Sequence, residues 1–263
     1  MSVTSVVMIG ANGRMGRMIA SLAQEDVEFA LSGVIDRESA REELKTRFGD
    51  CPVGASLEEM LPKVPAESVL VDFTAPAASM QNARAASAAG RPLVIGTTGF
   101  DAEQKKELAE LAKKAPLFWS TNMSIGISVL CRMLPELAKA LGPDYDMEMV
   151  EIHHKHKKDA PSGTALTLGK CLAESRGWDA DAVRCSGRDG IIGERPHEQI
   201  GIQALRGGDV VGVHTVYLLG PGERIEVSHQ AHSRENFARG ALRAAAWMAG
   251  RKPGRLYGML DVI

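Results

Sequence analysis

The feature that most constrains this chain is a glycine-rich turn between a short apolar run and a helical stretch. Residues 6–9 are typical of a buried strand, and Gly10, Gly13 and Gly16 then recur at every third position, entering a helical pattern over residues 14–23. Glycine lets a backbone turn tightly and approach a ligand closely, and a helix N-terminus presents unpaired N–H groups and a positive dipole end. The turn therefore predicts a phosphate-binding site in a βαβ unit.

The residues around this turn indicate a dinucleotide. Its spacing differs from the strict G-x-G-x-x-G fingerprint, because Asn12 occupies the central position. Asp36, which lies 20 residues past Gly16 and ends a second apolar run, can accept hydrogen bonds from a ribose 2′-hydroxyl. Arg37 can instead pair with a 2′-phosphate, so we expect NADH and NADPH both to be tolerated. The alternative is a plain tight turn with solvated charges.

Short apolar runs alternate with helical stretches through the first half of the chain. Strands are expected at residues 6–9, 29–35, 68–73, 93–95 and 117–119, and helices at 14–23, 77–89 and 101–114. Strands separated by helices indicate parallel βαβ units that are covered on both faces and bind ligands at the carboxyl ends of the strands. The expected fold class is α/β, with a doubly wound, Rossmann-like dinucleotide-binding domain.

The pattern changes after about residue 124. A helix is expected over residues 124–141, a strand over 145–153 and a second helix ending near 175, followed by strand-like segments at 199–205, 211–219 and 224–231. Glycine-rich turns join the last segments, which predicts a smaller α+β domain with a mixed sheet. A final helix over 234–249 can return to the first domain. We therefore expect a dinucleotide-binding domain at 1–124 with 234–263, and a substrate-binding domain at 125–233.

Composition excludes several classes of function. The net charge of −2 gives no reason to expect a nucleic-acid partner. A membrane span is not expected, because the chain lacks a run of about 18 apolar residues. None of the four cysteines belongs to a C-x-x-C pair, which favours reduced thiols and a cytoplasmic location.

Two segments of small polar residues follow the fourth and fifth predicted strands, where a doubly wound fold meets its ligand. They are Gly96, Thr97 and Thr98, and Ser120, Thr121, Asn122 and Met123. Such residues suit the ribose and the nicotinamide amide, although ordinary loops use the same residues.

The densest chemistry lies in residues 151–164, EIHHKHKKDAPSGT. If the chain stays extended through Lys157, His153 and Lys157 face one side by strand periodicity, and His154 and His156 face the other. Imidazole transfers protons near neutral pH, and a lysine ammonium attracts a carboxylate. His153 is thus a candidate acid, and Lys157 a candidate carboxylate contact.

Ser162, Gly163 and Thr164 are typical of a helix N-terminus, whose free N–H groups form an anion site. A substrate that carries a carboxylate fits these residues. Two other interpretations stay open, a solvated charged loop and a metal site on the three histidines. Zinc sites usually have a better-spaced ligand set, and adjacent histidines on a strand point apart, so we expect no metal. The remaining histidines, including His214, look isolated and are interpreted as structural or surface residues.

Four segments together resemble the 4-hydroxy-tetrahydrodipicolinate reductase (dihydrodipicolinate reductase) family. They are GANGRMG at 10–16, VIGTTGF at 94–100, NMSIG at 122–126 and HHKHKKDAPSGT at 153–164. The likeness runs essentially end to end and includes RGGDVVG-x-HT at 206–215. The H-H-x-x-K-x-D-A-P-S-G-T string is highly specific, whereas many dehydrogenases share the glycine turn.

The resemblance implies a cytoplasmic enzyme of lysine and diaminopimelate biosynthesis, usually a homotetramer built through the sheets of its second domains. It implies hydride transfer from NADH or NADPH to C4 of a cyclic unsaturated imine dicarboxylate. His153 takes the position of the proton donor, Lys157 that of a second donor and carboxylate contact, and His154 a substrate-binding position. The backbone carboxylate site corresponds to Gly163 and Thr164, and Ser162 joins them as a substrate-binding position through the helix start.

By the same resemblance, the cofactor positions are Gly10, Ala11, Asn12, Gly13, Arg14, Met15, Asp36, Arg37, Gly96, Thr97, Thr98, Ser120, Thr121, Asn122 and Met123. Two alternatives stay open at this point. One is another two-domain NAD(P)-dependent dehydrogenase, and the other is a non-catalytic NAD(P)-binding sensor.

Overall fold

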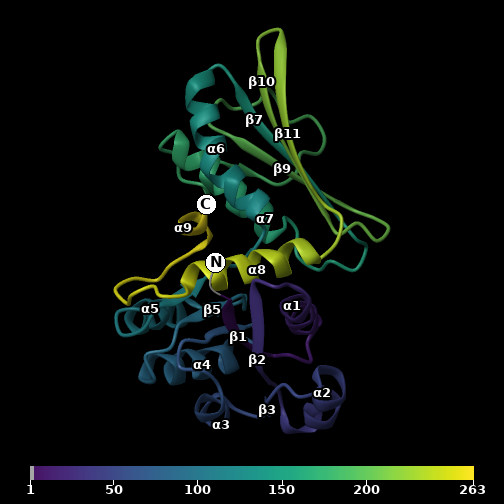
Figure 1. The fold of residues 1–263 in the computed structure, drawn as a ribbon. Coiled ribbons are helices and arrows are strands. Elements are labelled where there is room, and N and C mark those ends of the chain that lie inside the picture. Colours follow the sequence, from purple (N-terminus) through teal and green to yellow (C-terminus); the bar gives the residue numbers. More distant parts are fainter. Residues whose placement is uncertain (1–2) are drawn as a thin grey trace. The chain divides into compact units, whose positions relative to one another are not determined.

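The computed structural model describes residues 3–263, which divide into two compact units (Figure 1). Unit 1 comprises the described residues up to Ser124 together with Glu235–Ile263, and unit 2 comprises Ile125–Arg234. None of the helices within residues 3–263 is both long and apolar enough to cross a membrane.

Unit 1 is built on a six-stranded parallel sheet. Its strands are β1 (Thr4–Ile9), β2 (Phe29–Ile35), β3 (Val53–Gly54), β4 (Val69–Asp72), β5 (Leu93–Ile95) and β6 (Leu117–Trp119). Their order is β3-β2-β1-β4-β5-β6, so the direction of winding reverses between β1 and β4. This confirms the expected doubly wound fold, which binds ligands at the carboxyl ends of the strands beside that reversal.

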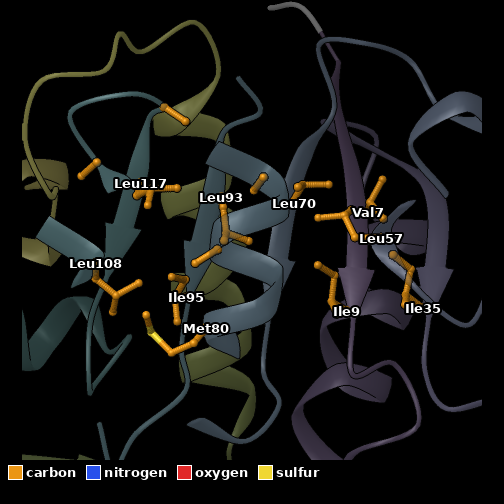
Figure 2. Packing of buried hydrophobic residues seen from close by; sticks show 14 of the residues in the cluster. Val7, Ile9, Ile35, Leu57, Leu70, Met80, Leu93, Ile95, Leu108 and Leu117 are labelled. Carbon is orange, nitrogen blue, oxygen red and sulfur yellow. The ribbon is translucent and has the colours of Figure 1, made fainter. Parts of the chain in front are cut away.

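Helices cover both faces of this sheet. They are α1 (Arg14–Glu25), α2 (Arg41–Phe48), α3 (Leu57–Met60), α4 (Pro76–Ala88), α5 (Ala102–Leu111), α8 (Glu235–Met248) and α9 (Met259–Val262). Helix α1 contacts α8, and α4 contacts α3 and α5. Successive strand residues point to opposite faces. Figure 2 shows one resulting layer, in which Val7, Ile9 and Ile95 of the strands pack with Met80 of α4.

Unit 2 is built on a mixed five-stranded sheet, as expected. Its strands are β7 (Asp146–His153), β8 (Arg184–Cys185), β9 (Ile200–Arg206), β10 (Gly212–Gly220) and β11 (Glu223–Ala231), in the order β11-β10-β7-β9-β8. Strand β7 is parallel to β9 and antiparallel to β10. The two helices α6 (Ile125–Leu141) and α7 (Gly163–Ser175) pack against each other, and α7 contacts β7 and β9.

Strand β7 alternates between buried and partly buried residues over its whole length. Met147 and Met149 belong to the hydrophobic core that α6 and α7 cover. Glu151 and His153 continue the same buried row, although both are polar. Because a buried polar group needs partners, the end of β7 is where this unit departs from a purely apolar core.

Candidate active site

The glycine turn of unit 1 requires glycine for steric reasons at both ends. Gly10 has a φ of +83°, and a Cβ there would lie 2.6 Å from the carbonyl oxygen of Phe73. A Cβ on Gly16 would lie 2.0 Å from the carbonyl oxygen of Gly10. The N-cap residue of α1 is Gly13, which has no side chain to accept hydrogen bonds from the first amides. The first turn of α1 therefore keeps donors for an anion.

Asp36 is tied to this turn. Its carboxylate accepts hydrogen bonds from the backbone N–H of Asn12 and from that of Arg37, both at 2.8 Å. The Arg37 side chain is 89% exposed. Asn12 stands where the strict fingerprint has glycine, and its side chain forms hydrogen bonds with other residues. Its Oδ1 accepts from the Arg17 guanidinium at 2.6 Å, and its Nδ2 donates to Glu43.

A cavity of about 640 Å³ opens beside the turn, within the size range of small-molecule sites. Its lining comes from the carboxyl ends of β1, β2 and β4 and from α4, and includes Gly10, Asn12, Gly13, Asp36, Arg37, Phe73, Thr74 and Asn82. Five of these residues are predicted cofactor positions. A close-approach turn, free helix amides and an acidic strand end fit the pyrophosphate and ribose of a dinucleotide.

The other predicted cofactor positions lie around the turn or at neighbouring strand ends. Arg14 and Met15 begin α1, while Ala11 is fully buried and donates its N–H to the carbonyl of Ile35 at 3.1 Å. Residues 96–98 follow β5 and residues 120–123 follow β6. A Cβ on Gly96 would lie 2.2 Å from the Phe73 ring, so this residue must be small. Met123 is buried.

A buried carboxylate behind this edge of the sheet was not anticipated. Asp72 at the end of β4 accepts hydrogen bonds from the backbone and hydroxyl of Thr74, from the Asn82 amide at 2.8 Å and from the Thr97 hydroxyl. Burial raises the pKa of Asp72 against the effect of these donors. The Thr97 hydroxyl thus supports Thr74 in the wall of the cavity, and the Thr97 carbonyl accepts from the Trp119 indole at 3.0 Å.

In unit 2, β7 ends at His153, so the chain is not extended through Lys157. The prediction that placed His153 and Lys157 on one side by strand periodicity therefore rested on a wrong assumption. His154 donates its N–H to the carbonyl of Val210 at 2.8 Å, and the N–H of Lys157 returns to the carbonyl of His154. This turn sets the direction of Lys157, whose Nζ lies 2.9 Å from an Asp159 carboxylate oxygen. His154 and His156 remain near each other, with ring centroids 6.3 Å apart.

The centre of the unit 2 site is Glu151, which is fully buried. Its Oε2 lies 2.6 Å from Nδ1 of His153 and accepts from Arg206 at 2.7 Å. Its Oε1 accepts from the other Arg206 amino group at 2.7 Å and from the Ser162 N–H at 2.9 Å. One carboxylate therefore joins the candidate acid on β7, a cation on β9 and the residue before α7.

Ser162 is the N-cap of α7, as the sequence predicts. Its hydroxyl accepts from the Ala165 N–H at 3.2 Å and lies 2.9 Å from Nε2 of His214. His214 is buried, and its ring centroid lies 5.1 Å from that of His153. The interpretation of His214 as an isolated histidine is therefore wrong. The Ser162 side chain is therefore engaged within the protein, with the Ala165 amide and the His214 ring.

Burial and charge set the protonation of this group. Burial raises the pKa of Glu151, but hydrogen bonds from Arg206, His153 and Ser162 outweigh it and leave the pKa below its ordinary value. Burial lowers the pKa of His153, against the raising effect of Glu151. Burial and the nearby His153 lower the pKa of His214 to about 4. Glu151 is thus a carboxylate, and His214 is neutral at neutral pH.

The buried His214 predicts a pH-dependent stability. Its pKa is 6.5 when unfolded and about 4 when folded, so the unfolded state binds more protons between these values. The stability that His214 contributes is complete above pH 6.5 and is lost as the pH falls towards 4, by about 3 kcal/mol in total. In urea unfolding measured across this pH range, the free energy of unfolding of His214→Gln should fall by about 3 kcal/mol less than that of the wild type. The exposed His232→Gln serves as the control, and identical pH slopes in all three proteins would contradict the prediction.

Sequence reasoning missed the roles of Glu151 and Arg206. The signal for Glu151 lies in the alternation of β7, because Met147 and Met149 predict that position 151 is also buried. Arg206 and His214 carry no such local signal. Within residues 3–263, no group of three or more His, Cys, Asp or Glu side chains is arranged to hold a metal ion.

Comparison with known proteins covers both units. The family description "Dihydrodipicolinate reductase, N-terminus" matches residues 4–123, and "Dihydrodipicolinate reductase, C-terminus" matches residues 126–263. The chain is 64% identical over 260 residues to the 4-hydroxy-tetrahydrodipicolinate reductase of Desulfovibrio desulfuricans, covering 98% of this chain and 99% of the relative. It is 60% identical over 259 residues to that of Oleidesulfovibrio alaskensis, with the same coverage.

A solved structure supports the fold. The dipicolinate-bound dihydrodipicolinate reductase from Paenisporosarcina sp. TG-14 superposes with a TM-score of 0.78 at 24% identity, and the match covers 100% of both chains.

Proposed function

The chain belongs to the dihydrodipicolinate reductase family, and we propose that unit 1 holds the nicotinamide cofactor while unit 2 binds the dicarboxylate and supplies the proton. It is an NAD(P)H-dependent oxidoreductase of lysine and diaminopimelate biosynthesis, which reduces 4-hydroxy-tetrahydrodipicolinate, by way of dihydrodipicolinate, to tetrahydrodipicolinate. The main observation in support of this division of roles is that the Glu151 carboxylate bonds both to His153 and to Ser162 at the start of α7.

When bound, the reduced nicotinamide supplies the hydride for C4 of the substrate ring. In unit 1, the N–H groups of the first turn of α1 hold the pyrophosphate, because those of Ala11, Asn12 and Gly13 already donate within the turn and to β2 and Asp36. Asp36 accepts from the ribose hydroxyls, and residues 96–98 and 120–123 line the path to the nicotinamide. The Arg37 side chain is 89% exposed and pairs with Asp36 only at 3.8 Å, so it can turn to a 2′-phosphate, which supports use of both NADH and NADPH.

In unit 2, we assign the proton for C3 to Nε2 of His153. Nδ1 already donates to the Glu151 carboxylate, so Nε2 is the nitrogen that gains and loses the catalytic proton. The Lys157 ammonium and the N–H groups of Gly163 and Thr164 neutralise the substrate carboxylates, and His154 adds a polar contact. Ser162 supports this anion site as the helix cap, because its hydroxyl is occupied by Ala165 and His214.

Lys157→Ala should raise the KM for the dicarboxylate by at least about tenfold, because a charge-assisted contact of roughly 1.5–3 kcal/mol is lost. Steady-state kinetics with saturating NADH measures this. The neighbouring Lys158→Ala is the matched control, because its side chain is exposed and has no assigned role. An unchanged KM in Lys157→Ala would remove this lysine from the carboxylate site.

We also propose a homotetramer in the cytoplasm, with no nucleic-acid partner. The edge of the unit 2 sheet supports assembly, because β11 is a nine-residue edge strand and such edges readily pair with another chain. The net charge of −2 argues against nucleic acid. Light scattering on the purified protein tests the assembly, and a monomer at micromolar concentration would contradict it.

A coupled assay tests the function. The purified chain is added to pyruvate, aspartate semialdehyde and the preceding synthase, and the absorbance of the reduced nicotinamide is followed with NADH and then with NADPH. We expect loss with both cofactors, at kcat/KM values within about 100-fold of each other, which is roughly 2.7 kcal/mol of discrimination. No loss with either cofactor would refute the proposed reaction, and a larger preference would refute the assignment of Arg37.

A further inference from the structure

Glu151 has every acceptor position engaged, and its partners come from three separate elements. His153 lies on the same strand, Arg206 ends the neighbouring strand β9, and Ser162 precedes α7. The carboxylate is fully buried, yet its charge faces the Arg206 guanidinium through two hydrogen bonds of 2.7 Å. Paired bonds of this kind set orientation as well as charge.

This arrangement selects one tautomer of His153. A carboxylate only accepts hydrogen bonds, so the proton of the neutral ring resides on Nδ1 and leaves Nε2 with its lone pair. Nε2 in turn lies beside Gly212 of β10, where a Cβ would come within 3.0 Å of it. The reactive nitrogen therefore has the backbone of a glycine beside it instead of a side chain.

The charged groups around His153 have opposite effects on the protonation of its ring. Glu151 favours the protonated ring, whereas Arg206 on β9 and Lys157 after β7 disfavour it. His214 on β10 faces the same ring but is neutral, and Asp159 balances Lys157 through a 2.9 Å contact. Lys157 has the larger lowering effect on the pKa of His153 and Arg206 the smaller one, but Arg206 is the cation that bonds directly to the Glu151 carboxylate and partly cancels its charge.

We propose that Glu151 and Arg206 are positioning residues, which together fix His153 with Nδ1 protonated and set the pH range in which Nε2 can donate its proton. The proposal rests on the proposed role of His153 as the proton donor. Arg206 acts through Glu151, because its guanidinium bonds to that carboxylate and not to the ring.

The test is a pair of substitutions with opposite expected effects. Glu151→Gln removes the negative charge, so His153 should lose its proton more readily, and the pH above which kcat falls should move down by about one unit. Arg206→Met removes a positive charge, so this pH should move up, by less than in Glu151→Gln because Arg206 has a smaller effect on the ring than Glu151 has. In both variants kcat at the optimum should fall at least about tenfold, with the KM for NADH nearly unchanged. The double variant should return the pH midpoint towards that of the wild type.

Glu148→Gln is the matched control. Glu148 also lies on β7 and also receives two hydrogen bonds from one arginine, Arg188, but it lies on the other face of the strand. Its pH profile should match that of the wild type. Shifts of equal size in Glu148→Gln, or shifts of the same sign in Glu151→Gln and Arg206→Met, would overturn the proposal.

A second measurement does not depend on activity. Nitrogen-15 NMR of the histidine rings in the wild-type protein reports the tautomer and titration midpoint of His153, which is identified by its missing signal in His153→Gln. We expect the Nδ1–H tautomer and midpoints that move in opposite directions in the two variants. An Nε2–H tautomer, or midpoints that do not move, would overturn the proposal. If the titrations behave as expected but the wild-type protein consumes no cofactor with the substrate, the proposed function fails instead.

Discussion

His153→Gln should lower kcat by roughly 10²- to 10⁴-fold, the range typical of general acid–base catalysis, and leave the affinity for NADH nearly unchanged. Glutamine can still donate an amide N–H to Glu151, but it has no proton to give at neutral pH. The cofactor-binding residues that we assign lie in unit 1, whereas His153 lies in unit 2. Steady-state kinetics gives kcat, and fluorescence titration gives the Kd for NADH.

The control for this substitution is His156→Gln. His156 lies three residues further along the chain and is exposed, so its loss should leave kcat near that of the wild type. Wild-type turnover in His153→Gln would remove the proton-donor role. A large loss of NADH affinity in the same variant would contradict the division of roles between the units.

Gly16→Ala should raise the Kd for NADH by about 100-fold or more, equivalent to roughly 2.7 kcal/mol. The new Cβ would lie 2.0 Å from the carbonyl oxygen of Gly10 and 2.7 Å from its carbonyl carbon. Both obstacles are backbone atoms, so the turn must open and the N–H groups of the first turn of α1 must leave the positions that hold the pyrophosphate. Fluorescence titration with NADH measures the loss.

The matched control is Gln24→Ala, an exposed position on the same helix. It should bind NADH like the wild type. Circular dichroism on both variants shows whether Gly16→Ala remains folded. Wild-type affinity in a folded Gly16→Ala protein would contradict the role that we assign to the turn.

Three strands of unit 1 were predicted best. The expected strands at 29–35, 93–95 and 117–119 have the same bounds as β2, β5 and β6. Parallel strands that are covered on both faces consist of nearly continuous apolar residues, which is a strong local signal. The shortest elements gave no such signal. Strands β3 and β8 are two residues long, and α2 buries only Leu44 and Phe48.

The features of the candidate site likewise differ in how well the sequence predicts them. The glycine turn and the Ser162 cap are local features, and their residue types indicate the local structure. The bonds from Arg206 to Glu151 join residues 55 apart, and Ser162 lies 52 residues from His214. Those contacts depend on which strands become neighbours in the sheet. The turn after His153 likewise depends on the distant residues Gly208 and Val210, whose carbonyls accept the N–H groups of Lys155 and His154.

The central claim is that this chain reduces the cyclic imine by hydride transfer from a reduced nicotinamide cofactor, with His153 as the proton donor. The most direct measurement is the mass of the product when the coupled reaction runs with NADH deuterated at both positions of nicotinamide C4. We predict that the wild-type protein yields tetrahydrodipicolinate one mass unit heavier than with ordinary NADH, and that His153→Gln yields the same labelled product far more slowly. Product without the label, or labelled product formed equally fast by both proteins, would contradict the account.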